Sequence, residues 1–289
     1  MKLSLTVSML LTKKEQKRSV VLAVVIATVC SYAFIKSSRI LLSNIIPDQQ
    51  VQDVIELFSG MLVIIGLFAF ARYYSGRSSA SLGLSWKKPF KNIGIGLLTG
   101  GAFLTFVFLI NLAFGSIEVS FDLQSISFLY IVACFFGYFV QGTMEEVLAR
   151  GFTMNAVSAK TNIWIGIIVS SVIFTAMHGA NPSMGIIPIL NLFLASLILS
   201  FVFYLSDNIL LAGVFHGMWN FMLGHFYGVS VSGWDNTSSI LQTCLLPDMS
   251  LINGGDFGFE GGLALSIAGA ITLAIQFYFV KRKMNHPAA

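Results

Sequence analysis

Long apolar runs, each closed by charged or turn-forming residues, follow one another along almost the whole chain. Their length and spacing are typical of helices, and about 20 apolar residues are enough for a helix to cross a bilayer. Helices are predicted at residues 20–35, 54–74, 93–114, 128–159, 163–177, 186–205, 209–226 and 263–280. The pattern therefore predicts an all-α polytopic membrane protein with about eight transmembrane helices.

The composition supports this prediction. Hydrophobic residues make up 56% of the 289 residues and charged residues only 10%, against about 25% charged residues in soluble domains. A soluble monomer is excluded, and no stretch remains for a separate soluble domain. We expect a basic cytosolic N-terminal arm at residues 1–18, one transmembrane domain at 19–283 with a motif core at 126–227, and a tail at 284–289.

The net charge of +4 reflects membrane topology rather than binding to nucleic acid, because the basic residues cluster between the apolar runs. With the N-terminus inside, 14 of the 17 Lys and Arg residues fall in cytosolic segments. Two, Lys36 and Arg39, fall in external segments, and Arg150 lies within a span. This asymmetry predicts that both termini are cytosolic.

Polar residues inside the predicted spans are few, and most of them lie on three helices. The costly ones are Glu145, Glu146, Arg150, His178, His216, Asn220 and His225, and the milder ones are Gln141, Asn155 and Asn191. A charged group at the centre of a bilayer costs several kcal/mol on insertion scales. Two adjacent glutamates therefore require a partner, a proton or a water-filled cavity.

Helical spacing indicates how these side chains are directed. Glu146 and Arg150 are four residues apart and can form an ion pair on one face, whereas Glu145 is turned about 100° away and is free to act as a base. His216 and Asn220 also share a face. Counted from the turn at residues 160–162, Glu145 and His178 reach the same depth. His216 comes out about 10 Å shallower, so a tilt or a submerged loop is needed to bring it level.

Three motifs in order resemble those of a known family. They are Glu145-Glu146-Val147-Leu148-Ala149-Arg150, Phe174-Thr175-Ala176-Met177-His178 and His216-Gly217-Met218-Trp219-Asn220. The chain is similar here to the CAAX protease and bacteriocin-processing family of intramembrane endopeptidases, which includes type II CAAX prenyl proteases. The resemblance covers residues 145–220, whereas the flanking helices match only in hydrophobicity and number.

The resemblance implies a role for each matched residue. Glu145 would activate a water with help from His178, while His216 and Asn220 would stabilise the oxyanion. Glu146 and Arg150 would support the site, although such a buried pair can also serve structure alone. Two aromatic residues beside these motifs either pack the helices or form a pocket wall, namely Phe174 and Trp219. His225 is interpreted as structural.

No cofactor is predicted, but zinc stays open as the alternative. Glu145, His178 and His216 form a set of ligand types that zinc accepts, while the His-Glu-x-x-His helix of many zinc peptidases is missing. The three cysteines are far apart and odd in number, so they indicate neither a disulfide framework nor a thiolate metal site. The metal-free mechanism is favoured.

Two functions remain open at this point. The first is an intramembrane endopeptidase that hydrolyses a peptide bond in a peptide or lipid-modified protein at the membrane. The second is a non-catalytic protein, either a scaffold of the bacteriocin-immunity type or a proton-coupled transporter, that uses the same polar cluster. In either case the expected partners are the lipid bilayer and no nucleic acid, and the expected location is a bacterial plasma membrane.

Overall fold

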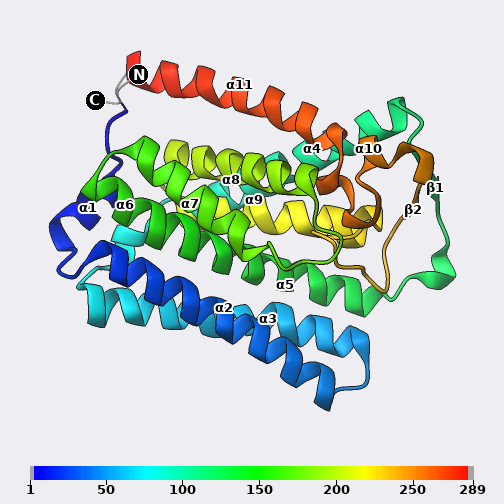
Figure 1. Cartoon of the computed structure of the whole chain (residues 1–289), viewed down its shortest axis with the longest axis horizontal. Coiled ribbons are helices and arrows are strands. Elements are labelled where there is room, and N and C mark those ends of the chain that lie inside the picture. Colours follow the sequence, from blue (N-terminus) through cyan, green and yellow to red (C-terminus); the bar gives the residue numbers. More distant parts are fainter. Residues whose placement is uncertain (1–2, 286–289) are drawn as a thin grey trace.

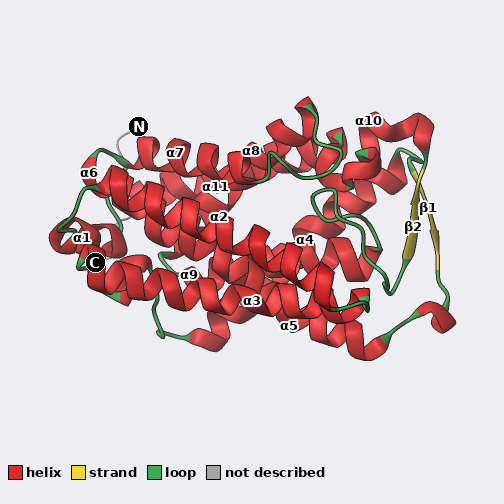
Figure 2. Cartoon of the chain, turned by 60° about the horizontal axis from the view of Figure 1, so that its bottom comes forward, coloured by secondary structure: helices red, strands yellow, loops and turns green. Residues whose placement is uncertain are grey.

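The computed structural model describes residues 3–285, which form a bundle of helices with one small two-stranded sheet (Figure 1). The long helices are α2 (Val20–Ile45), α3 (Gln49–Phe70), α4 (Pro89–Ala113), α5 (Phe128–Glu146), α7 (Ile163–Met177), α8 (Ile186–Ser206), α9 (Ile209–Phe221) and α11 (Leu263–Asn285). The short helices are α1 (Val7–Glu15), α6 (Asn155–Lys160) and α10 (Ser250–Asn253). The strands β1 (Ile117–Ser120) and β2 (Gln242–Leu245) pair antiparallel, at the end of the bundle opposite α1 (Figure 2).

The predicted fold class is confirmed: the chain is an all-α, multi-pass membrane protein. Within residues 3–285, seven helices are long and apolar enough to cross a membrane. The fifth predicted helix, α7, is apolar but has only 15 residues, fewer than a full crossing by itself requires. The long fourth run is one span over Phe128–Lys160, in which α5 passes through a π-helical segment, Val147–Met154, into α6.

Helix α2 differs from the prediction at its C-terminal end. The apolar pattern predicts that this helix ends near residue 35 and that Lys36 and Arg39 lie in an external segment, but the helix continues to Ile45. It ends just before Pro47, because the residue preceding a proline disfavours the helical conformation. Lys36 and Arg39 are therefore helical residues within a candidate span, which corrects the predicted boundary.

Both ends of the described chain lie at the same end of the bundle. The hydroxyl of Tyr204, near the end of α8, donates to the carbonyl of Ser4. Lys283, near the end of α11, donates through Nζ to the carbonyl of Tyr204. The predicted N-terminal arm contains helix α1, whose Met9 and Thr12 are buried. Of the predicted tail, residues 286–289 lie outside the described part of the chain.

The centre of the bundle is a close contact between α5 and α9. A Cβ atom at Gly142 would lie 2.5 Å from the backbone nitrogen of Gly217, and one at Gly217 would lie 2.6 Å from the carbonyl oxygen of Tyr138. Only glycine permits two helix backbones to approach so closely. This contact brings together the two helices that carry Glu145 and His216 (Figure 1).

Arg77 joins four segments near the end of the π-helical segment. Its guanidinium donates to the carbonyls of Gly151 at 2.8 Å and Phe152 at 3.0 Å. It also donates to the hydroxyl of Thr12 in α1 and to the carbonyl of Ser81. The side chain is fully buried. The π-helical segment that follows Glu145 is therefore held at its C-terminal part by a cation from outside the spans.

Burial lowers the pKa of the Arg77 guanidinium to about 9, while Glu15 acts in the opposite direction, so the group is still a cation at neutral pH. Replacing Arg77 with Met should lower the free energy of unfolding by about 3 kcal/mol, because several buried carbonyls lose their donor. Thermal unfolding in detergent measures this. The exposed Arg72→Met is the control, and equal melting temperatures for the two variants would contradict the account.

Candidate active site

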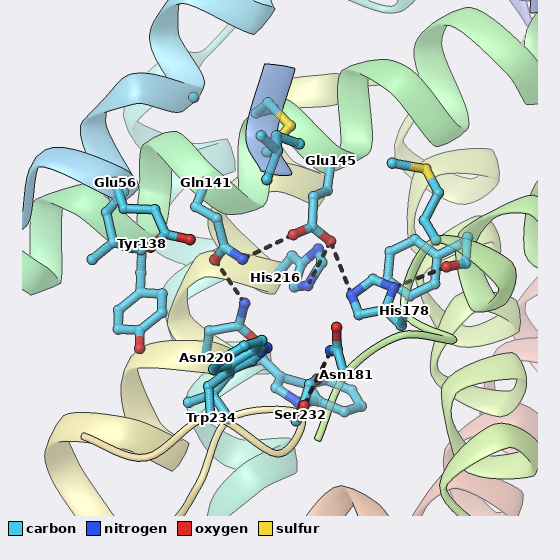
Figure 3. A pocket seen from close by; sticks show the side chains of 18 of the residues that line it. Glu56, Tyr138, Gln141, Glu145, His178, Asn181, His216, Asn220, Ser232 and Trp234 are labelled. Carbon is cyan, nitrogen blue, oxygen red and sulfur yellow. Dashed lines mark hydrogen bonds and ion pairs between the residues drawn. The ribbon is translucent and has the colours of Figure 1, made fainter. Parts of the chain in front are cut away.

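Three helices bring a carboxylate and two imidazoles together inside the bundle. Glu145 comes from the last turn of α5, His178 directly follows α7, and His216 lies in α9. The Nε2 atoms of His178 and His216 lie 3.8 Å and 3.9 Å from Oε2 of Glu145 (Figure 3). The structure thus places these three predicted residues around one point.

The depth mismatch predicted for His216 has a structural explanation. The turn between α8 and α9 is covered by α1 and by the segment around Gly83. The side chain of Asp207 in this turn accepts hydrogen bonds from Ser8 of α1, and the amide of Ile209 donates to the carbonyl of Gly83 at 2.9 Å. Asn208 and Ile209 are buried. A submerged loop therefore lets His216 reach the depth of Glu145.

Hydrogen bonds fix the orientation of both imidazole rings. Nδ1 of His178 contacts the carbonyl of Phe174 at 2.9 Å, and because a carbonyl can only accept, Nδ1 carries the proton. A neutral His178 then presents the lone pair of Nε2 to Glu145. Nδ1 of His216 lies 3.0 Å from Oε1 of Glu146, so its Nε2 also faces Glu145. Oε2 of Glu145 is buried and has no hydrogen-bond partner within the described chain.

Gln141, for which the sequence predicts no role, connects two of the predicted site residues. Its Nε2 donates to Oε1 of Glu145 at 2.8 Å, and its Oε1 accepts from Nδ2 of Asn220 at 2.9 Å (Figure 3). Asn220 therefore reaches Glu145 through Gln141 rather than directly. The spacing could have indicated this residue, since Gln141 is one helical turn before Glu145.

Glu146 and Arg150 form the predicted ion pair, fully buried, on the far side of His216. Nη1 of Arg150 lies 2.8 Å from Oε1 of Glu146, and Nη2 donates to the hydroxyl and the carbonyl of Ser196 in α8. The guanidinium also lies 4.9 Å from the ring centre of Phe174. Ser196 gave no signal in the sequence, because a serine in an apolar run is ordinary.

The three helices line a cavity of about 220 Å³, to which α2, α3, α8 and the loop that follows α9 also contribute. Phe174 and Trp219 both line it, and the ring of Phe174 lies 4.6 Å from that of His178. Nε1 of Trp219 donates to Glu260 at 3.0 Å, and Glu260 also accepts from the amide and hydroxyl of Ser232. The buried Glu260 thus fixes the loop that lines one end of the cavity, a role that the sequence analysis did not assign to it.

The remaining polar residues of the spans do not contact Glu145. Nδ1 of His225 bonds to the carbonyl of Ser238 at 2.7 Å, and its ring packs edge-on against Tyr130. Asn155 donates to Ser8 and to the carbonyl of Ser81, and Asn191 donates to the carbonyls of Glu260 and Gly262. Each of these contacts ties helices or loops together, as interpreted for His225 from the sequence.

The ligand atoms of Glu145, His178 and His216, the alternative zinc set, lie too far apart to bind one zinc ion in the observed geometry. Zinc bonds of about 2.0–2.1 Å in a tetrahedron place the ligand atoms about 3.3–3.4 Å apart. Glu145 lies 3.8 Å from His178 and 3.9 Å from His216. Within residues 3–285, no group of three His, Cys, Asp or Glu side chains meets the spacing of a metal site. The residue types suit zinc, but the spacing of the three side chains does not.

The fold and site define a multi-pass membrane protein with a carboxylate and two imidazoles in an intramembrane cavity. Residues 127–222 match the family model of the type II CAAX prenyl endopeptidases, Rce1-like. This match confirms the resemblance that the three motifs indicate. It supports a general assignment to the CAAX-type intramembrane proteases, a class of peptidases. The matched segment, about a third of the chain, contains all three motifs. No curated protein matches the chain.

Proposed function

We propose that the protein is an intramembrane endopeptidase in which Glu145 activates a water that hydrolyses a peptide bond of a membrane-associated substrate. The observation that carries this proposal is the position of Oε2 of Glu145. This oxygen is buried, lacks a partner within the described chain and faces Nε2 of both histidines. Two proton acceptors 3.8 Å apart, Oε2 of Glu145 and Nε2 of His178, suit a single water that donates to both.

A water held in this way presents its lone pair to a substrate carbonyl. Its oxygen attacks the carbonyl carbon while Glu145 accepts one proton, and the same carboxyl then gives that proton to the leaving amine. His178 accepts the second hydrogen bond of the water and orients it. The products are a new carboxyl terminus and a new amino terminus, so one water is consumed for each bond broken.

The oxyanion of the tetrahedral intermediate requires hydrogen-bond donors in the same cavity. Asn220 gives one N–H of its amide to Gln141 and keeps the other for this purpose. His216 has a carboxylate oxygen beside each ring nitrogen, Oε1 of Glu146 at Nδ1 and Oε2 of Glu145 at Nε2. In the proposed state both nitrogens are protonated, and Nε2 donates a hydrogen bond to the oxyanion. One such donor typically accounts for about 10²–10³ in kcat. Glu146 and Arg150 hold the ring of His216 in place.

Gln141 is a positioning residue for Glu145 in this mechanism. Replacing Gln141 with Met should lower kcat about 10-fold to 100-fold, because the carboxylate loses one charge-assisted hydrogen bond and can rotate. KM should change little, since Gln141 acts through Glu145 and Asn220 rather than on the substrate itself. Steady-state kinetics of the purified variant measure this, with the exposed Gln124→Met as control. A change in KM alone would place Gln141 at the substrate instead.

The proposed function is tested in membranes by searching for new carboxyl termini. Membranes from cells that make the unaltered protein are compared by mass spectrometry with membranes that contain Glu145→Gln at equal amount. The proposal predicts at least one new terminus that depends on Glu145. The non-catalytic alternative predicts none, and proton-dependent solute flux in liposomes without hydrolysis would identify a carrier.

A further inference from the structure

The loop after α7, residues 179–185, carries the chain away from His178. The amide of His178 donates to the carbonyl of Thr175 at 3.1 Å, in a closing turn of the kind that frays readily. The amide of Asn181 donates to the carbonyl of His178 at 2.9 Å, so both residues belong to one turn. Within residues 3–285 this loop makes one side-chain hydrogen bond, from Nδ2 of Asn181 to the carbonyl of Ser232 at 3.1 Å (Figure 3). The place of His178 therefore depends on where Ser232 lies.

Ser232 lies in a tight turn of the loop that follows α9. The amides of Val231 and Trp234 donate to each other's carbonyls at 2.9 Å and 3.0 Å. The two residues between them, Ser232 and Gly233, have φ angles of +50° and +84°. Positive φ at both central positions is the geometry of a type I′ turn. It suits glycine, whereas a residue with a Cβ atom adopts it at a cost, so Ser232 requires a contact that holds it there.

Glu260, in the loop before α11, provides this contact. Its Oε2 accepts from the amide of Ser232 at 2.8 Å and from the hydroxyl of Ser232 at 2.7 Å. Its Oε1 accepts from Nε1 of Trp219 at 3.0 Å. Both Glu260 and Trp219 are buried. Because Trp219 belongs to α9, the helix that carries His216, the carboxylate joins the turn to a fixed part of the site.

Three donors on one side chain require a carboxylate at position 260. A carboxylate accepts hydrogen bonds on both oxygens, whereas a glutamine of the same size has a single acceptor oxygen. Its NH₂ group would face either Trp219 or the two donors of Ser232. Glu260→Gln therefore removes the contact that holds the turn with almost no change in volume.

We propose that Glu260 is a positioning residue for His178 and acts through Ser232 and Asn181. The carboxylate holds Ser232 in the left-handed conformation and so directs the carbonyl of Ser232 at Nδ2 of Asn181. Asn181 then fixes the turn at the end of α7 from which His178 faces the cavity. This inference rests on the proposed function for its effect on catalysis. It adds to the site a residue outside the matched segment, 127–222.

Nitrogen-15 NMR of the histidine rings tests the inference without turnover. In mildly alkaline buffer Nδ1 of neutral His178 carries the proton, because it donates to a backbone carbonyl of α7. Glu260→Gln and Asn181→Leu should each release the end of α7, so that this hydrogen bond is lost and the proton moves to Nε2 in a large share of the molecules. The ring signals of His216 should stay unchanged, since a separate contact fixes that ring. His178→Gln assigns the signals.

The kinetic expectation follows from the same path. On a peptide whose cleavage in membranes depends on Glu145, both variants should lower kcat about 10-fold to 100-fold, because the group that orients the water is displaced. KM should change little, since the effect falls on the water rather than on the substrate. The control is Asp256→Asn, which changes an exposed acid of the same loop as Glu260 and should keep both the rate and the spectrum.

The substitution Ser232→Gly separates the path through Ser232 from a general loosening of the loop. Glycine takes positive φ without the Cβ penalty and keeps the carbonyl that Asn181 needs. Added to Glu260→Gln, it should restore much of kcat and the proton on Nδ1 of His178. Added to Asn181→Leu, it should restore neither, because the donor to that carbonyl is missing. Absence of rescue in the first pair, or equal rescue in both, would contradict the path.

The outcomes separate this inference from the proposed function. A His178 spectrum that is unchanged in Glu260→Gln and Asn181→Leu would overturn the inference, even with a lower kcat, since Glu260 would then only support the loop. Asn181→Leu lies in a largely exposed loop and decides the question if Glu260→Gln does not fold. A changed spectrum without any membrane peptide whose cleavage depends on Glu145 would leave the positioning of His178 intact and refute the proposed function.

Discussion

Glu145→Gln is expected to lower kcat for peptide hydrolysis by about 10³–10⁴-fold while the protein folds and inserts normally. The amide keeps the size of the carboxylate and can still accept at Oε1 from Gln141. It cannot accept a proton from the attacking water or pass one to the leaving amine. Rates of hydrolysis by the purified protein, measured on a peptide whose cleavage in membranes depends on Glu145, test this expectation.

The control for this variant is Glu118→Gln, which changes an exposed glutamate in β1, far along the chain from the site. It should keep the full rate. Thermal unfolding should give the same midpoint for both variants, since Oε2 of Glu145 makes no hydrogen bond within the described chain that the amide would break. Near-normal hydrolysis by Glu145→Gln would remove Glu145 from the mechanism.

Arg150→Met is expected to have the largest effect on stability, about 3–5 kcal/mol of the free energy of unfolding. The substitution leaves the carboxylate of Glu146 buried beside only His216, and it leaves the carbonyl and hydroxyl of Ser196 without their donor. Denaturant unfolding of the detergent-solubilised protein measures the loss.

The double variant Glu146→Gln with Arg150→Met separates the charge from the packing. Because it removes both charges together, it should regain a substantial part of the lost stability. It should not regain activity, since His216 loses the carboxylate that fixes its ring. A double variant no more stable than Arg150→Met would show that the ion pair does not account for the loss.

Much of the fold could be predicted because lipid imposes a simple rule on sequence. Uninterrupted apolar runs give the helices, and helix α7 begins and ends at the predicted residues, 163 and 177. The prediction was wrong at the end of α2, because two charged residues in sequence usually mark the start of a loop. Arg39 can lie within the helix because Trp234 and Glu56 contact its side chain. Both partners are distant in sequence, so the local pattern does not predict these contacts.

The ionisable residues of the candidate site could be predicted, because an ionisable side chain within a span is rare. Glu145, His178 and His216 stand out because each is costly in lipid, and the structure brings them together. Gln141 was recognised as a polar residue of the span but received no role, and Ser196 does not stand out because a serine in an apolar run is ordinary. The depth of His216 was also beyond the sequence, because it depends on how α1 covers a distant turn.

The most direct test of the central claim is a single turnover in water labelled with heavy oxygen. The protein is in excess over a peptide whose cleavage in membranes depends on Glu145, and mass spectrometry follows both the product and the fragment of the protein that contains Glu145. If Glu145 activates water, each new carboxyl terminus gains one labelled oxygen and Glu145 gains none. Label in Glu145 with an unlabelled product would show that the carboxylate attacks the substrate itself and would contradict the account.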